Sequence, residues 1–445
     1  MRKHSRIRFA AAAAAVGLLA LAGCSSGSVD EPSGEPEQGT IDWWGWNPDD
    51  SQYQEIVDLF NEEYPDITVN YRFIQFSDYL NALRLGLTSG DGPDVFGVQT
   101  GAMATQFAPL SADLTPYLTE NLGDDWSDQI LAADQLNIDG SQMGLPWMVT
   151  GGGTIQVNMT LLESLGLEAP TNLDEWQEVC AGLETAGYDC LIQGAKDDWQ
   201  NIDVFQAIAN QVEVGYFYDA LAGSQPFDSP EMTTAFEGWQ ELFDLGVIQE
   251  GAFGTTAYPD AADTFRSGEA GMIAFGTWQN QDMTQSRLDT YAEQYGDPAV
   301  AQTEFLLVPF PNVVEPSGTA DLTLFGGPDV AWSMDASSDA SATAWTFLSW
   351  LSTSQASQER IAGTLQQPGL ASVAIDTSDI RTERQTEAVE AQAGALADLA
   401  GPRQIESADV QAALGDALAS VANGSMTAAE AVTAVQAAID TAAAA

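Results

Sequence analysis

Any chemistry in this chain has to proceed without histidine, because the only one among its 445 residues is His4, close to the N-terminus. Catalysis by Ser-His-Asp or Cys-His groups needs an imidazole base, and the common zinc sites use histidine ligands. We therefore predict no metal site and no cofactor. Carboxylates and the lone Lys196 of the body remain as the possible acid–base groups.

A second group of candidates combines tryptophan with amides and carboxylates. Trp46 and Asn47 follow the first predicted strand, Gln99 and Thr100 follow the third, and the segment 196–201 (KDDWQN) follows a later one. The carboxyl ends of parallel strands face the ligand crevice of an open sheet. There a ring can stack on apolar faces of a ligand while amides and carboxylates bond its hydroxyl groups. The alternatives are a solvated loop at 99–100 and a solvated helix start at 196–201.

The elements that must position these residues alternate between strand and helix. Short apolar runs bounded by Gly, Pro or Asn predict strands, and apolar residues at helical spacing predict helices. The predicted strands are 41–44, 67–73, 93–98, 154–157, 190–193 and 272–275; the predicted helices are 51–64, 78–89, 172–183, 232–245 and 341–351. This order predicts parallel βαβ units and an α/β fold, and the alanine-rich last 60 residues predict a helical C-terminal region. About 400 residues exceed one hydrophobic core, so we expect two domains.

The N-terminus has the features of an export signal. Four basic residues precede an apolar stretch over 9–22, which ends in Leu21-Ala-Gly-Cys24. This ending resembles the bacterial lipobox, so we predict a signal peptide over 1–23 and lipidation of Cys24. The alternative is an ordinary signal peptide with a chance cysteine. Residues 24–39, rich in Ser, Gly, Pro and Glu, predict a flexible tether to the outer face of the cytoplasmic membrane.

The charge balance after Cys24 excludes several partners. All 65 acidic residues but only nine of the 13 basic ones follow it. Such a field repels nucleic acid and anionic lipid, so we expect no nucleic-acid partner and membrane contact through the lipid anchor only. The acidity itself is explained by solubility or adaptation to salt. In an exported protein Cys180 and Cys190 favour a disulfide, the alternative being two buried thiols.

Six patches in order along the chain carry a family resemblance. They are Ile41-Asp-Trp-Trp-Gly-Trp-Asn-Pro48 with the helix to 60–69, Leu87-Thr-Ser-Gly-Asp-Gly-Pro-Asp-Val-Phe96, Gly144-Leu-Pro-Trp147, Phe265-Arg-Ser-Gly-Glu-Ala-Gly-Met-Ile-Ala-Phe-Gly-Thr-Trp278, Phe325-Gly-Gly327 and 344–356. Together they resemble the family 1 extracellular solute-binding proteins of ABC importers, the sugar-binding group related to maltose-binding protein.

The resemblance implies the periplasmic-binding-protein fold, in which two α/β lobes are joined by a hinge and hold the ligand in the cleft between them. It places the N-terminal lobe at 40–147 plus 331–365 and the C-terminal lobe at 148–330 plus 366–445. It also implies a monomer that delivers its ligand to permease subunits in the membrane.

Combined with the strand-end pattern, the resemblance yields twelve candidate ligand contacts. Trp44 and Trp278 are those that the resemblance itself brings to the cleft, and Trp278 is the preferred stacking ring. The candidates are Trp44, Trp46, Asn47, Gln99, Thr100, Trp147, Asp198, Trp199, Trp278, Gln279, Gly326 and Gly327.

Three functions compete at this point. The first is a lipid-anchored receptor that captures a mono- or oligosaccharide and is not an enzyme. The second is a secreted glycosidase, which needs a correctly spaced pair of carboxylates, and no spacing in the sequence identifies one. The third is a receptor for a cationic solute such as a polyamine, held by carboxylates and cation–π contacts.

Overall fold

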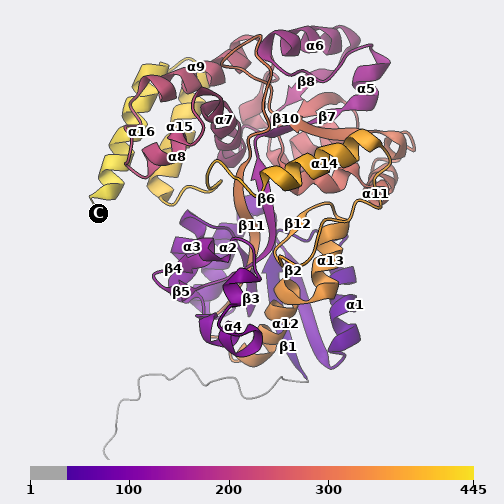
Figure 1. The fold of residues 1–445 in the computed structure, drawn as a ribbon, viewed down its shortest axis with the longest axis vertical. Coiled ribbons are helices and arrows are strands. Elements are labelled where there is room, and N and C mark those ends of the chain that lie inside the picture. The colour runs from indigo at the N-terminus through magenta and orange to yellow at the C-terminus, as the bar shows by residue number, and fades with distance from the viewer. Residues whose placement is uncertain (1–37, 445) are drawn as a thin grey trace, which may run out of the picture. The chain divides into compact units, whose positions relative to one another are not determined.

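A computed structural model describes residues 38–444, which belong to one compact unit of the chain (Figure 1). The predicted signal peptide, the lipidation site Cys24 and nearly all of the tether lie outside the described residues. Within 38–444, none of the helices combines the length and the apolar character needed to cross a bilayer.

A mixed six-stranded sheet organises the N-terminal part of the described chain. Its strands are β1 (Gly39–Gly45), β2 (Ile67–Phe73), β3 (Val95–Val98), β6 (Leu145–Gly152), β11 (Phe325–Met334) and β12 (Gln367–Pro368). The order is β12-β6-β11-β3-β1-β2. β1 pairs in parallel with both β2 and β3, which confirms the predicted βαβ units, whereas β11 runs antiparallel to β3 and β6.

Two cores cover the two faces of this sheet because successive strand residues point to opposite sides. Trp43 belongs to the core under α1 and α12, and its neighbour Trp44 belongs to the core under α2 and α3. Val95 and Phe96 on β3 divide in the same way. The covering helices are α1 (Tyr53–Glu63), α2 (Phe76–Ser89), α3 (Ala102–Phe107), α4 (Thr115–Leu122), α12 (Ser341–Thr353) and α13 (Gln355–Gly363).

A four-stranded sheet organises the second lobe, in the order β10-β7-β9-β8. Its strands are β7 (Thr154–Asn158), β8 (Asp189–Ile192), β9 (Ala270–Ile273) and β10 (Phe305–Pro309), and β8 and β9 are parallel. The helices of this lobe are α5 (Met159–Ser164), α6 (Leu173–Ala186), α7 (Asp198–Val212), α8 (Tyr216–Leu221), α9 (Pro230–Asp244), α10 (Ala262–Arg266), α11 (Gln285–Tyr295), α14 (Glu383–Ala395), α15 (Ala408–Ala422) and α16 (Ala428–Ala443).

Short elements complete the chain. They are the hairpin β4 (Asn137–Ile138) and β5 (Ser141–Gln142) and the helical turns η1 (Ala108–Leu110), η2 (Trp126–Asp128), η3 (Ala133–Leu136), η4 (Ala252–Gly254), η5 (Ala257–Ala261), η6 (Thr277–Met283) and η7 (Val300–Gln302). Of these, η5 and η6 carry side chains of the pocket described below.

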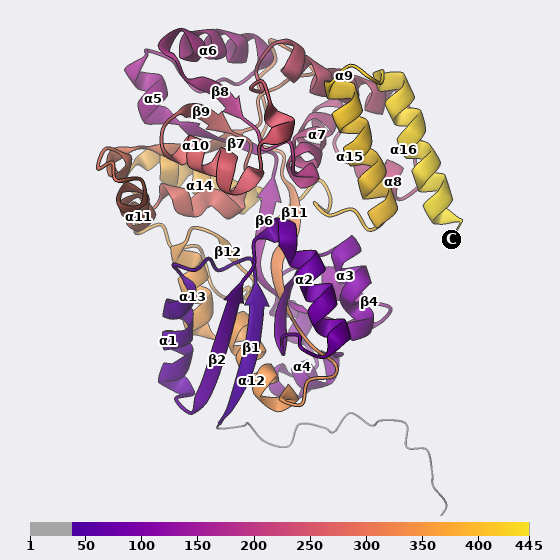
Figure 2. The same ribbon diagram turned by 180° about the vertical axis from the view of Figure 1, so that it is seen from behind.

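Two long strands, β6 and β11, run from the six-stranded sheet toward the second lobe (Figures 1 and 2). Their upper ends pair through glycine, Gly326 opposite Gly151. A Cβ on Gly326 would lie 2.0 Å from the carbonyl oxygen of Thr150, so only glycine permits this approach. The paired strands therefore form the connection between the lobes.

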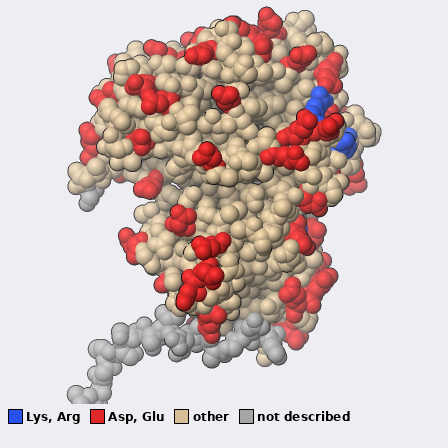
Figure 3. Space-filling model, viewed as in Figure 1, with Lys and Arg blue, Asp and Glu red and all other residues tan. Residues whose placement is uncertain are grey.

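The helical C-terminal region packs on the second lobe. The Nε1 of Trp239 on α9 donates a 2.9 Å hydrogen bond to the carbonyl oxygen of Leu418 on α15. In the same lobe, a disulfide joins Cys180 of α6 to Cys190 of β8, as the sequence predicts. Outside the core, acidic side chains are spread over the face shown in Figure 3, with few basic ones among them.

Candidate ligand-binding pocket

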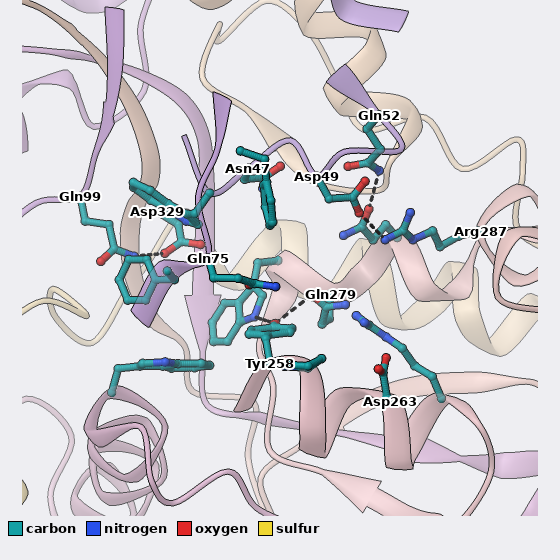
Figure 4. A pocket seen from close by; sticks show the side chains of 18 of the residues that line it. Asn47, Asp49, Gln52, Gln75, Gln99, Tyr258, Asp263, Gln279, Arg287 and Asp329 are labelled. Carbon is teal, nitrogen blue, oxygen red and sulfur yellow. Dashed lines mark hydrogen bonds and ion pairs between the residues drawn. The ribbon is translucent and has the colours of Figure 1, made fainter. Parts of the chain in front are cut away.

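A cavity of about 280 Å³ lies between the two lobes, and the side chains of both line it (Figure 4). The first lobe and β11 contribute Trp46, Asn47, Asp49, Gln52, Phe73, Gln75, Phe76, Gln99 and Asp329. The second lobe contributes Trp199, Tyr258, Pro259, Asp263, Arg266, Trp278, Gln279, Gln281, Arg287, Tyr291, Gln294, Arg403 and Gln404. Small-molecule sites begin at roughly 300 Å³, so the cavity suits a small ligand.

Parallel strand ends explain how distant residues meet here. In the first lobe, Trp46, Phe73 and Gln99 stand at or just beyond the carboxyl ends of β1, β2 and β3. In the second lobe, Trp199 follows β8 and Trp278 follows β9, and these two strands are parallel. The carboxyl ends of both sheets thus supply the pocket.

The second lobe builds an aromatic shelf, which we define as Trp199, Tyr258 and Trp278. The rings of Trp199 and Tyr258 are nearly parallel, at 15°, with centroids 6.1 Å apart. Trp278 meets Trp199 edge-on at 6.2 Å, and its Nε1 donates a 3.2 Å hydrogen bond to the Tyr258 hydroxyl. Phe275 lies 5.0 Å from Tyr258 at an angle of 9° and supports the shelf. The shelf offers ring faces to the apolar side of a ligand.

The first lobe opposes this shelf with further rings and with amides. Trp46 meets Phe76 and Tyr79 edge-on, at 5.2 Å and 4.9 Å. It also lies on Gly97, where a Cβ would come within 3.0 Å of its ring. Figure 4 shows Gln75 and, beyond it, Asn47 on this side. A ligand in the pocket therefore meets aromatic surface from both lobes and amides from the first.

Arg403 anchors the inner end of the pocket. Its guanidinium lies 4.0 Å from the centroid of the Trp278 ring and 5.3 Å from that of Trp199. The same group bonds Asp203 of α7 at 2.8 Å and Asp329 of β11 at 2.6 Å. Gln99 donates a 2.8 Å bond to Asp329 as well. One arginine thus fixes the shelf against a strand that joins the lobes.

Arg287 and Gln281 of the second lobe bond residues of the first lobe at the outer end. Arg287 of α11 forms an ion pair with Asp49 at 2.7 Å, and Gln52 donates a 3.0 Å bond to Gln281. Burial alone would raise the pKa of Asp49, but the charge of Arg287 and hydrogen bonds from Ser51 outweigh it and hold that pKa below its usual value. The carboxylate is therefore ionised and paired at neutral pH.

The arginines around the pocket are paired rather than free. Of the nine basic residues after Cys24, three line the cavity, namely Arg266, Arg287 and Arg403. Each is bonded to a carboxylate. Among residues 38–444, no cluster of three or more His, Cys, Asp or Glu side chains is arranged to hold a metal ion. Carboxylates therefore neutralise the three cations of the lining.

Half of the twelve predicted contacts lie in the lining. They are Trp46, Asn47, Gln99, Trp199, Trp278 and Gln279. Their contact with a ligand stays a prediction. Trp278 is only 8% exposed and Arg403 covers its ring, so Trp199, which is half-buried, is the more accessible face of the shelf.

Two predicted tryptophans belong to the core instead, and we correct their assignment. Trp147 is 1% exposed and packs edge-on against Trp332 at 5.4 Å. Trp44 is 9% exposed, lies against Gly86 of α2 and is covered by the guanidinium of Arg72 at 4.4 Å. Both sit within strands, where alternation directs the ring into a core, whereas Trp46 lies beyond the end of β1.

The remaining four predicted contacts also fall outside the lining. Thr100 is buried next to the pocket residue Gln99 without reaching the cavity. Asp198 lies against Gly415 of α15, because consecutive residues of a helix point in different directions. Gly326 and Gly327 pair with residues of β6 in the antiparallel ladder between β6 and β11.

Several lining residues were not predicted from the sequence. Arg266 lies inside one of the six resemblance patches and Asp329 lies two residues after another, so both had a positional signal. Tyr258 and Arg403 follow no predicted strand, and only a neighbouring proline distinguishes them in the sequence. Their roles depend on tertiary contacts.

With the fold and the pocket established, comparison with known proteins identifies the class. The profile of the bacterial extracellular solute-binding protein family matches residues 44–358, and the chain belongs to this family. The family consists of solute-binding proteins rather than enzymes, which removes the glycosidase hypothesis.

A sequence relative is the maltotriose-binding protein of Pyrococcus abyssi, which is 22% identical over 333 residues. That alignment covers 74% of this chain and 63% of the relative. The chain spans about half the length, 53%, of three putative binding proteins of Brucella, at 22% identity.

Solved structures share the two-lobed fold. One, determined in work on xylan utilization by Caldanaerobius polysaccharolyticus, is 22% identical, with a TM-score of 0.72 over 89% of this chain and 99% of that one. The GacH receptor of Streptomyces glaucescens, studied with acarbose, is 19% identical, with a TM-score of 0.69 over 91% and 98%. The predicted α/β fold with two lobes is confirmed.

Proposed function

We propose that this protein captures a neutral mono- or short oligosaccharide between its lobes and delivers it to the permease of an ABC importer. The observation that carries the proposal is the aromatic shelf of Trp199, Tyr258 and Trp278, faced by Trp46 and rimmed by amides. A pyranose has apolar CH faces that stack on rings and a rim of hydroxyls that bond amides, so it matches both surfaces.

The names of related proteins support a carbohydrate. A maltotriose-binding protein, a chitin oligosaccharide binding protein and a raffinose-bound protein are all similar to this chain. They differ from one another in ligand, so they favour the class of ligand and not one sugar.

The charge distribution argues against a cationic solute. A polyamine needs unpaired carboxylates, but Asp49 is bonded to Arg287 and Asp329 to Arg403. Asp263 accepts a 2.7 Å hydrogen bond from Tyr295. A cation at Asp49 or Asp329 would have to displace an arginine, whereas a neutral sugar leaves both pairs intact.

A thermal-shift screen against mono-, di- and oligosaccharides tests the proposal, with spermidine as the matched cationic probe. A ligand present at about 100 times its Kd stabilises the fold by about 2.7 kcal/mol, which raises the melting temperature by several degrees. We expect a shift with at least one neutral sugar and none with spermidine. A shift with spermidine alone would reverse the assignment. The bound sugar should be recovered without new reducing ends.

We also propose the division into lobes at 40–147 plus 331–365 and 148–330 plus 366–445, with β6 and β11 as shared crossings. Export and anchoring through Cys24 complete the proposal, and we expect a monomer. Cys24→Ser should release the protein from the membrane fraction while leaving sugar affinity unchanged. Retention of the variant in that fraction would contradict the anchor.

A further inference from the structure

A buried carboxylate behind the pocket wall holds several of the lining residues. Asp282 of η6 is completely buried and does not line the cavity. Its Oδ2 accepts a 3.0 Å bond from Gln279 and a 3.1 Å bond from Arg266, and its Oδ1 accepts a 2.6 Å bond from the Tyr291 hydroxyl. Gln279, Arg266 and Tyr291 come from η6, α10 and α11, and all three line the pocket.

The bonds continue from Asp282 to the aromatic shelf. Gln279, held at its Nε2 by Asp282, accepts a 3.1 Å hydrogen bond at its Oε1 from the hydroxyl of Tyr258. That hydroxyl in turn accepts the bond from the Nε1 of Trp278. The orientation of both rings is thereby tied to the position of the buried carboxylate.

In the other direction the bonds reach the first lobe. The Tyr291 hydroxyl that donates to Asp282 accepts a 3.0 Å bond from Nε of Arg287, and Arg287 forms the ion pair with Asp49 across the cleft. Arg287 and Arg266 also lie over the Tyr291 ring, at 4.9 Å and 4.8 Å from its centroid. A single chain of bonds therefore runs from Asp49 to the shelf.

We propose that Asp282 is a positioning residue, and that its bonds couple the Asp49–Arg287 contact between the lobes to the placement of the shelf. The proposal takes its ligand, a sugar, from the proposed function. The bonds that carry the coupling do not depend on that function. A buried carboxyl group that accepts from three donors fixes all three, and weakening it as an acceptor loosens every bond in the chain. Closure of the lobes and orientation of the shelf rings then occur together.

A double-mutant cycle tests the coupling. Asp282→Asn keeps the shape of the side chain but removes its charge, and we expect the Kd for the sugar found in the screen to rise at least about tenfold. Asp49→Asn should weaken binding in the wild type and have much less effect in the Asp282→Asn background. Independent sites give additive effects within about twofold, and additivity here would overturn the proposal.

A matched control separates this coupling from loss of stability. Glu304→Gln breaks an ion pair with Arg384 in the same lobe and touches no pocket residue. It should leave the Kd unchanged and be additive with Asp49→Asn. If Asp282→Asn does not fold, Tyr291→Phe interrupts the same chain and replaces it in the cycle with the same expectation.

A measurement without sugar distinguishes failure of the coupling from failure of the proposed function. If the wild type binds no carbohydrate, the function is wrong, and small-angle scattering of the ligand-free protein still tests the bonds. Asp282→Asn and Asp49→Asn should each increase the radius of gyration relative to Glu304→Gln, because the contact between the lobes is weakened. Equal radii would overturn the coupling.

Discussion

Trp199→Ala is the substitution that most directly tests the shelf. Trp199 is half-buried at the cavity. The centroid of its ring lies 6.1 Å from that of Tyr258, 6.2 Å from that of Trp278 and 5.3 Å from the guanidinium of Arg403. Loss of a central aromatic anchor costs about 2 kcal/mol of binding free energy or more, which corresponds to roughly a 30-fold rise in Kd.

The cost to folding should be smaller than the cost to binding. Arg403 is 9% exposed and keeps its closer contact with Trp278 at 4.0 Å, so we expect loss of the 5.3 Å contact and of partial burial to lower the free energy of unfolding by about 1–2 kcal/mol. For a lobe of this size that lowers the melting temperature by about 5 °C. Titration calorimetry gives the Kd, and calorimetric scans without ligand give the melting temperature.

Trp147→Ala is the matched control, because Trp147 is 1% exposed and does not line the pocket. Truncation of a buried tryptophan costs about 3–5 kcal/mol of stability. Its folded fraction should bind with unchanged Kd. Trp278→Ala should both raise the Kd and lower the melting temperature, since Trp278 is 8% exposed and also lines the cavity. A Kd for Trp199→Ala within twofold of the wild type, at undiminished folding, would refute the role of the shelf.

Three further predictions concern charge and the disulfide. The pKa of Asp49 is lowered in the folded state, so ionised Asp49 stabilises the fold fully above its unfolded pKa near 3.9, and this stabilisation is lost as the pH falls through the folded pKa. The free energy of unfolding of Asp49→Asn should therefore depend less on pH in acid than that of the wild type. Identical dependence on pH for the two proteins would contradict this prediction. Salt should raise the melting temperature by screening 65 acidic residues from one another, checked by scans from low to about 1 M NaCl. Replacing Cys180 and Cys190, which are 10 residues apart, by serine should cost about 2–3 kcal/mol in denaturant unfolding, and an unchanged midpoint would exclude a stabilising bridge.

The elements of this fold follow from local signals in the sequence. Apolar spacing and proline or glycine boundaries predict β1, α1, β2, α2 and β3 in order, and the strand–helix alternation requires their parallel pairing. The rule that ligands meet the carboxyl ends of parallel strands then selects Trp46, Gln99, Trp199 and Trp278 without any knowledge of contacts. These signals act over a few residues, so one sequence is sufficient to detect them.

Tertiary structure decided which aromatic rings face the cavity. Trp44 and Trp46 are two residues apart in one motif, and only the point at which β1 ends sends the first into a core and the second to the pocket. Arg403 stacks on a ring 125 positions earlier in the chain, and no local pattern records such a pairing. Asp282 resembles any of the other acidic residues in the sequence. Its burial among donors from three elements exists only after those elements have packed, which is why the sequence alone could not assign its role.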